Sequence, residues 1–429
     1  MSILKKIISV KSFHLSVYML ASLGPMVVSV LLNPLFAINM SPKDYAICGY
    51  YNSFNPIFLP LINFLFVRYY LKRYFEVDES ERKRIKATVY QLSLIVSFGL
   101  LIVALVSELI YMKYFNSNSE LPFLPYSILA LVPCYFQSIY ILELNELRMS
   151  SKSVGYLKIN WLSAFSALLL SLLFVVIFKW GAMGKLLGVA VASAFIFLYL
   201  LLKNKDLLKI KLDRSLVKCI VLFCLPIVIA DMLEFFSKGF DKVFLERIVD
   251  PDQLGYYTVG FSIAGLLSVF SKAISDTFAP DIYEAVAKRD LSKGMKYGGF
   301  QVALIAVIVL LFILFLPFII DILTAGRYVK STKFAMIISL SSITSGIYFL
   351  INNVMIALGK TKTVLSTKLI GSGFCVLMYY FLIKEWGTIG ASWGIVLSYL
   401  ILSISNFACY FIGERIILGK NYEVNYKRR

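Results

Sequence analysis

The sequence predicts an all-α protein that crosses a membrane about twelve times, in two halves that repeat each other. Of its 429 residues, 59% are hydrophobic and only 16% are charged, with a mean hydropathy of +0.79, whereas soluble domains carry about 25% charged residues. The chain contains WGAMG at 180–184 with Gly188 behind it, and WGTIG at 386–390 with Gly394 behind it. Two hydrophobic halves in the same order indicate parallel internal repeats, which are typical of transporters rather than enzymes.

The expected helices follow from apolar runs, because a membrane span needs roughly 20 apolar residues. Twelve such runs follow one another along the chain. They cover residues 13–37, 44–71, 88–112, 122–147, 159–178, 186–202, 219–245, 254–284, 297–321, 334–358, 364–383 and 389–412. The first run is longer than the core of a signal peptide, so we expect it to be retained as the first span.

The two halves are expected to meet at a short basic segment. We place one six-helix bundle at residues 1–202 and the other at 217–429, joined by a basic cytoplasmic linker at 203–216. A looser echo supports the repeat, since SPKDY at 41–45 resembles DPDQLGY at 250–256. We expect the linker, which is amphipathic, to lie along the inner membrane face.

Lysine and arginine predict the orientation in the membrane. The chain has 43 basic and 25 acidic residues, a formal net charge of +18. If both termini are cytoplasmic, 29 of the basic residues fall in inner segments and 9 in outer segments. This bias follows the positive-inside rule and favours an even number of spans. Orientation therefore explains the positive charge, and we expect no nucleic-acid partner.

No cofactor, metal or catalytic centre is expected. His14 is the single histidine, and the six cysteines lie scattered in apolar runs without metal-ligand spacing. The chain contains no P-loop, no GxSxG and no HExxH motif. These features argue against an enzyme and against transport driven by nucleotide hydrolysis in this chain.

The strongest functional signal is a set of charged residues inside the seventh apolar run. They share an arc of about 100° on one helix face. The set consists of Asp231, Glu234, Lys238, Asp241 and Lys242. Charges within a span usually face a water-filled cavity or a partner. Asp241 and Lys242 lie toward the outer end of the run, where we expect them to snorkel to the interface.

The eighth run adds Lys272 and Asp276, four residues apart. We expect Lys272 to face the transport cavity, and the alternative is a purely structural pair with Asp276 or Asp231. Asp231 and Glu234 are candidates for contact with substrate or with a coupling ion, H⁺ or Na⁺. Their alternative is structural pairing with Lys238.

Two further cations lie inside other apolar runs, Arg68 in the second and Lys368 in the eleventh. Such residues ordinarily snorkel from the end of a helix to the interface. Arg68 could instead meet a phosphate at the cytoplasmic entrance. Pro56, Pro60, Pro226 and Pro280 are expected to kink or unwind their helices around a central cavity.

Several short stretches together resemble the polysaccharide flippases that export O-antigen or capsule repeat units (Wzx-type). These belong to the multidrug/oligosaccharidyl-lipid/polysaccharide exporter (MOP) superfamily. The matching stretches are SPKDY at 41–45, Leu225-Pro226, Asp241, LGYY at 254–257, FAPDIY at 278–283, ALGKTK at 357–362 and WGTIGA at 386–391. Their order along the chain, rather than any one of them, carries the resemblance.

The resemblance implies a V of two six-helix bundles that opens alternately to either side of the bacterial inner membrane. It implies transport of an undecaprenyl-pyrophosphate-linked oligosaccharide to the outer leaflet, for O-antigen or capsule synthesis. The implied partners are membrane lipids and the polysaccharide polymerase and chain-length machinery. Lys272, Lys238 and Arg68 would neutralise the pyrophosphate. Asp231, Glu234 and Asp276 would bind the coupling ion or pair with these cations.

Two alternatives stay open within the same superfamily. The charged face of the seventh run is mixed in sign, so its carboxylates could hold a cationic drug in a multidrug exporter. A lipid II-type flippase is the other alternative, although such proteins usually carry two further helices.

Overall fold

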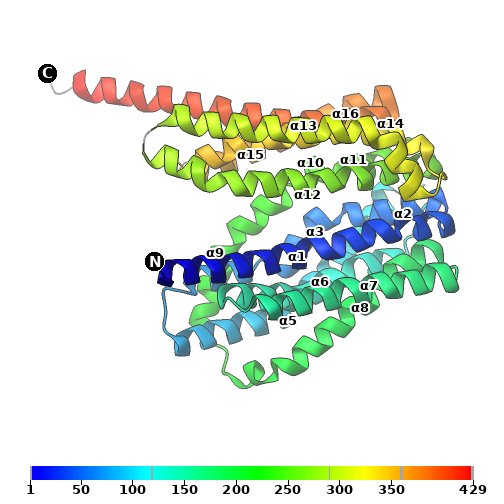
Figure 1. Cartoon of the computed structure of the whole chain (residues 1–429), viewed down its shortest axis with the longest axis horizontal. Helices are drawn as coiled ribbons and strands as arrows, with labels where there is room; N and C mark the ends of the chain where they lie inside the picture. The colour runs from blue at the N-terminus through cyan, green and yellow to red at the C-terminus, as the bar shows by residue number, and fades with distance from the viewer. Residues whose placement is uncertain (1, 117–118, 289, 358–360, 427–429) are drawn as a thin grey trace. The chain divides into compact units, whose positions relative to one another are not determined.

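The computed structural model describes residues 2–116, 119–288, 290–357 and 361–426, and every regular element among them is a helix (Figure 1). Some side chains within the helices, including those of Lys238 and Asp276, lie outside the described part. The helices form two units. Unit 1 comprises Met1–Met232 with Leu323–Arg327, and unit 2 comprises Leu233–Ile322 with Tyr328–Arg429.

Unit 1 is built from nine α-helices and the short helices between them. They are α1 (Ser2–Asn39), α2 (Pro42–Ser53), α3 (Asn55–Asn63), α4 (Val67–Arg73), α5 (Glu79–Ile110), η1 (Tyr111–Phe115), α6 (Tyr126–Met149), α7 (Ser153–Leu172), η2 (Leu173–Ile177), α8 (Gly181–Lys203), η3 (Lys205–Lys209) and α9 (Arg214–Met232). Helix α1 packs along α7, and α8 packs against both α6 and α7. A core cluster lies where α4, α5, α6, α8 and α9 meet, around Tyr70, Tyr90 and Leu200.

Unit 2 is also built from helices. It contains α10 (Phe235–Lys238), α11 (Phe240–Leu245), α12 (Pro251–Ala287), α13 (Leu291–Thr324), η4 (Val329–Ser331), α14 (Thr332–Ser339), α15 (Ser341–Ala357) and α16 (Thr361–Tyr426). Helix α15 packs between α12 and α16, with which it makes most of its contacts. Gly387 interrupts the helical backbone of α16, which therefore consists of two helices.

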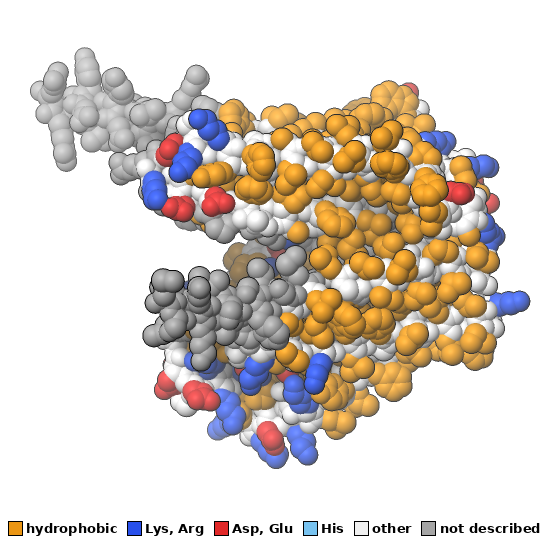
Figure 2. Space-filling model, in the orientation of Figure 1, with side chains coloured by type: hydrophobic (Ala, Val, Ile, Leu, Met, Phe, Trp, Pro, Cys, Tyr) orange, Lys and Arg blue, Asp and Glu red, His pale blue; other side chains and the backbone are white. Residues whose placement is uncertain are grey.

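Nine helices among the described residues are long and apolar enough to cross a membrane. The last of them, Ser366–Ala408, contains the two final predicted runs on either side of Gly387. The second predicted run, 44–71, is divided among α2, α3 and α4. Figure 2 shows hydrophobic side chains over the flanks of the helices and charged ones near their ends. The chain is thus an all-helical, multi-pass membrane protein, and the count of twelve spans stays a prediction.

The prolines fall close to some of the interruptions but not to all. Helix α3 begins at Asn55, directly before Pro56, and ends shortly after Pro60. Helix α9 instead continues through Pro226, and the helical pattern is interrupted further on, at Leu233–Glu234 and Gly239.

The predicted linker is attached to α5. The side-chain amide of Gln91 donates to the carbonyl oxygens of Leu207 (3.0 Å) and Ile210 (2.7 Å). Arg84 forms an ion pair of 2.7 Å with Asp213, and the hydrogen bond from the Ser215 hydroxyl lowers the pKa of Asp213. Helix α9 then packs against α3, α4 and α5. The expected change of bundle at 203–216 stays a prediction, while the contacts group α9 with unit 1.

The repeated tryptophan–glycine phrase forms the turn of a tight helical hairpin in each unit. Gly181 and Gly387 both have a left-handed backbone, with φ of 50° and 52°. A side chain at Gly188 would overlap with the backbone of Ser171, and one at Gly394 would overlap with the ring of Tyr379. Glycine is needed at all four positions, for conformation at the turn and for close approach of the helices.

Candidate functional site

The first candidate site lies in unit 2, between the start of that unit and α16. The Glu234 carboxylate forms an ion pair of 3.5 Å with the ammonium of Lys368. The side chains are 40% and 20% exposed, respectively, so the pair is reachable from outside. Ser372, one turn beyond Lys368, donates to the carbonyl oxygen of Leu233 at 3.4 Å. These contacts hold the interrupted segment at 233–234 against α16.

A small cavity of about 40 Å³ adjoins this ion pair. Three aromatic side chains, Tyr348, Phe349 and Tyr399, line it. The ring of Tyr348 lies 5.7 Å from that of Phe349 and 6.1 Å from that of Tyr399, so the three form one cluster. Lys272 of α12 is exposed and places its ammonium 5.6 Å from the centre of the Phe349 ring. Lys272, Lys368 and Glu234 are thus grouped around a single aromatic cluster. Such a site can bind a negative group through its lysines or a cation through its carboxylate and rings.

Two of the remaining predicted site residues belong to unit 1, and the side chains of the other two are not described. Arg68 is exposed on α4 of unit 1, and Asp231 is half-buried on α9, also in unit 1. The side chains of Lys238 and Asp276 lie outside the described residues, so their predicted roles stay predictions. Sequence spacing suggested Lys238 as the partner of Glu234, but it gave no sign of Lys368, which is 134 residues away.

The prediction that Asp241 and Lys242 snorkel to the interface is wrong, because both are buried, at 0% and 4% exposure. The Lys242 ammonium lies 3.6 Å from the Asp241 carboxylate and 3.3 Å from the centre of the Phe261 ring. The Tyr257 hydroxyl donates to the same carboxylate at 2.5 Å. Burying both charges is tolerated because each has a partner. Counting residues from the end of a run could not reveal the rings that cover this pair.

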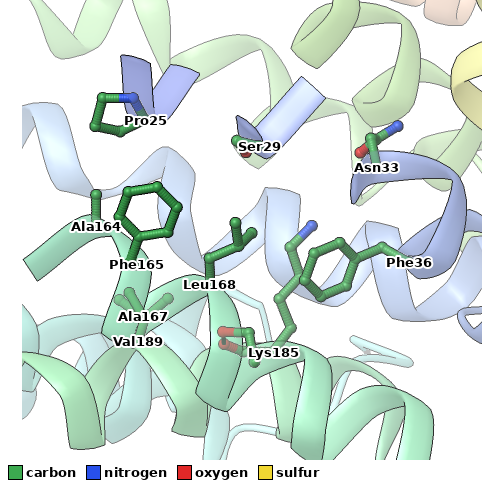
Figure 3. A pocket seen from close by; sticks show the side chains of 11 residues that line it. Pro25, Ser29, Asn33, Phe36, Ala164, Phe165, Ala167, Leu168, Lys185 and Val189 are labelled. Carbon is green, nitrogen blue, oxygen red and sulfur yellow. Dashed lines mark hydrogen bonds between the residues drawn. The ribbon is translucent and has the colours of Figure 1, made fainter. Parts of the chain in front are cut away.

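A second candidate site is a cavity of about 270 Å³ in unit 1, which the sequence did not predict (Figure 3). Side chains of α1, α7 and α8 line it. They are Pro25, Ser29, Asn33, Phe36, Ala164, Phe165, Ala167, Leu168, Ser171, Lys185 and Val189. Lys185 is half-buried, and its ammonium lies 4.8 Å from the ring centre of Tyr45 and 5.3 Å from that of Phe36. Because it directly precedes an apolar run, sequence analysis counted it as a loop residue.

The geometry near Lys185 depends on the first copy of the repeated phrase. The Asp44 carboxylate accepts hydrogen bonds from the backbone and hydroxyl of Ser41, and from the backbone N–H of Ala182 at 2.8 Å. Ser171 donates its hydroxyl to the carbonyl oxygen of Lys185 at 3.1 Å. The first turn of α8 is therefore held by Asp44 at Ala182 and by Ser171 at Lys185. These two bonds fix the position of the Lys185 backbone.

Comparisons with known proteins agree with the helical architecture. A protein of the Lsg locus of Haemophilus influenzae is 24% identical over 358 residues, which cover 81% of this chain and 85% of that protein. An inward-facing multidrug resistance MATE family transporter of the MOP superfamily has a similar structure, with a TM-score of 0.69 at 14% identity over 91% of this chain and 94% of the other. The lipid II flippase MurJ in an inward closed conformation gives 0.69 at 16% identity, over 91% and 86% of the two chains.

Two family patterns match the sequence, and their matches overlap. The MatE pattern matches residues 226–381. The pattern described as "Polysaccharide biosynthesis protein" matches residues 14–286, well over half of the chain. These matches confirm the resemblance found in the sequence, and the chain belongs to the polysaccharide biosynthesis protein family, within the MOP superfamily.

Proposed function

We propose that this protein moves an undecaprenyl-pyrophosphate-linked oligosaccharide from the cytoplasmic to the outer leaflet of a bacterial inner membrane. The observation that carries the proposal is the match of residues 14–286 to the polysaccharide biosynthesis protein family. It is a transport function rather than an enzymatic one, and the product would be used for O-antigen or capsule synthesis. The transported molecule would next meet the polysaccharide polymerase and chain-length machinery.

The proposed architecture is twelve spans in two six-helix bundles, with both termini cytoplasmic and the two halves related by a parallel pseudo-two-fold repeat. The hairpins at Gly181 and Gly387 support the repeat, since both glycines have a positive φ, of 50° and 52°. Such a pair of bundles would form a V that opens to each side in turn. This alternation would expose the sugar-binding surface first to the cytoplasm and then to the outside.

The unit 2 cluster supplies the chemistry for such a cargo. A pyrophosphate carries negative charge, which Lys272 and Lys368 could neutralise by charge-assisted hydrogen bonds. Aromatic rings beside them, Tyr348, Phe349 and Tyr399, offer flat apolar surfaces. Lys238 and Arg68 remain further candidates for pyrophosphate contact. Glu234, together with Asp231 and Asp276, is proposed to couple transport to H⁺ or Na⁺ or to position the lysines.

The proposal is tested in proteoliposomes with a fluorescent undecaprenyl-pyrophosphate oligosaccharide and, in parallel, a cationic dye. Movement of the lipid-linked sugar between leaflets without dye transport is the expected result. Dye transport without movement of the lipid would overturn the proposal. It would favour the multidrug exporter, for which the half-exposed Glu234 carboxylate beside aromatic rings is the supporting observation.

Lys272 is the first residue to change. In Lys272→Ala the ammonium beside Phe349 is lost, and we expect the flipping rate to fall about tenfold or more, the effect of losing one charge-assisted hydrogen bond. Lys296→Ala is the matched control, because Lys296 is an exposed lysine on the neighbouring helix α13. Equal flipping rates in Lys272→Ala, in the control and in the unchanged protein would exclude Lys272 from the mechanism.

A further inference from the structure

Lys185 has a half-buried positive charge that forms no direct ion pair with a described carboxylate. Its ammonium faces the rings of Tyr45 and Phe36, and no described carboxylate lies within 4.0 Å of it. The carboxylate of Asp44, the residue next to Tyr45, accepts hydrogen bonds from Ser41 and from the backbone N–H of Ala182. A cation held between rings and partly removed from water is favourably placed to receive an anion.

The cavity at Lys185 is polar at one end and apolar over the rest of its wall (Figure 3). Ser29 and Asn33 lie one turn apart on the face of α1 that meets Lys185. Apart from Ser171, whose hydroxyl is hydrogen-bonded to the carbonyl oxygen of Lys185, the remaining wall is formed by hydrocarbon and aromatic groups, including Phe165, Leu168 and Val189. A sugar would leave most of its hydroxyl groups without partners against this wall. An anionic head group joined to a hydrocarbon chain matches both the polar end and the apolar wall.

The helices around the cavity expose large apolar side chains. Leu31 of α1 is 69% exposed, Leu169 of α7 is 61% exposed and Phe195 of α8 is 62% exposed. Side chains of this kind suit contact with lipid hydrocarbon. Ser29 and Val189 of the cavity wall are themselves exposed, so the cavity is open to the surroundings of the helices.

The second copy of the repeat indicates that the hairpin does not need this charge. Lys185 follows Gly184 in the first copy, and Ala391 follows the corresponding Gly390 in the second. Ala391 is completely buried, and the hairpin around it is also closely packed, since side chains at Gly390 and Gly394 would overlap with Leu382 and Tyr379. Since packing does not require a lysine here, the charge in unit 1 points to a ligand.

We propose that the cavity between α1, α7 and α8 binds the phosphate group of a lipid, with Lys185 as the cationic ligand. The phosphate lies against the Lys185 ammonium and the Ser29 hydroxyl, and the adjoining hydrocarbon lies against Phe165, Leu168 and Val189. At about 270 Å³ the cavity holds a phosphate and a short length of chain, but not an oligosaccharide repeat unit. The phosphate can come from a bilayer phospholipid or from a polyprenyl carrier, because both share this chemistry.

Binding is measured on the purified full-length protein in detergent, with pairs of lipids that differ in the phosphate. The pairs are phosphatidylglycerol with diacylglycerol, and undecaprenyl phosphate with undecaprenol. We expect the protein to bind the phosphate-bearing member of at least one pair more tightly. In Lys185→Gln we expect the ratio of the two affinities, with phosphate over without, to fall about tenfold, the effect of losing one charge-assisted hydrogen bond.

Lys179→Gln is the matched control, because Lys179 lies exposed in the same hairpin turn and does not line the cavity. This control should keep the preference for phosphate. Preference for undecaprenyl phosphate alone would identify the carrier as the source, and equal preference in both pairs would identify any lipid phosphate. A preference that is unchanged in Lys185→Gln would overturn the proposal.

A second measurement does not depend on the variant being folded. A photoactivatable phosphatidylglycerol and a photoactivatable undecaprenyl phosphate are each cross-linked to the unchanged protein, and the labelled peptides are identified. Labels from either probe at Phe165, Leu168 or Val189 support the site, and their absence with both probes overturns it. Neither measurement involves transport, so the lipid-phosphate site and the proposed flippase function can fail independently.

Discussion

The two glycine hairpins of this chain are built alike, yet they differ in the turn and in one charge. A side chain at Gly184 would meet the backbone of Phe174, ten residues earlier. One at Gly390 would overlap with the carbonyl of Leu382, only eight residues earlier. The first hairpin accommodates its longer turn with the π-helical segment η2 and with Lys179, whose φ is 57°.

This difference separates what the fold requires from what is added to it. Both hairpins keep glycine at the turn, where φ is positive, and at the helix contacts, where a Cβ atom would overlap with backbone or with an aromatic ring. They differ at the position directly after the contact glycine, which is Lys185 in unit 1 and Ala391 in unit 2. Features that both copies share are therefore structural, and features present in one copy are candidates for function.

The largest effect is expected where a side chain would meet backbone. In Gly390→Ala the new methyl group would overlap with the carbonyl of Leu382, which cannot move without separating the two helices. We expect a loss of ~3 kcal/mol or more in the free energy of unfolding. Gly373→Ala, in the part of α16 before Gly387 and with no atom near its Cβ position, is the control and should change little. Thermal unfolding in detergent measures both, and equal stabilities would show that the close contact is not essential.

A smaller effect distinguishes the two turns. Gly387→Ala places alanine at a φ of 52° with only Val249 near, at 3.9 Å, so it should cost about 1 kcal/mol of backbone strain. Gly181→Ala adds a collision with the Asp44 carboxylate and displaces it from the N–H of Ala182. We expect it to lose about 1–2 kcal/mol more than Gly387→Ala. Equal losses in the two variants would mean that Asp44 does not stabilise the first turn.

The sequence predicted the helical class and most of the spans, and it singled out the repeated tryptophan–glycine phrase, because hydrophobicity and repetition can be recognised without tertiary structure. It also identified Glu234 and Lys272 as charges within apolar runs, and the structure groups both with Lys368 around the same aromatic rings. That grouping depends on how α10, α12 and α16 pack. The spacing of residues along one helix cannot show it.

Two other features could not be predicted, for different physical reasons. The burial of Asp241 and Lys242 depends on Tyr257 and Phe261, which come from the next helix along the chain. The Lys185 cavity depends on α1 and α7, which lie far from Lys185 in the sequence. An alignment of the two halves would have given one signal for the cavity, namely a lysine where the second copy has alanine.

The smallest expected effect concerns the caps that open α2 and α12, the two helices that begin with the looser echo. Ser41 and Asp250 occupy the N-cap positions, and each accepts a hydrogen bond from a backbone N–H three residues later. Asp250→Ala removes this bond alone, so we expect a loss of about 1 kcal/mol in the free energy of unfolding. Ser41→Ala should lose about as much from its own cap, and up to 1 kcal/mol more because Asp44 also depends on the Ser41 hydroxyl. Thermal unfolding of the two variants side by side measures the difference. A larger loss in Asp250→Ala would mean that the capping box around Ser41 and Asp44 does not strengthen the first copy.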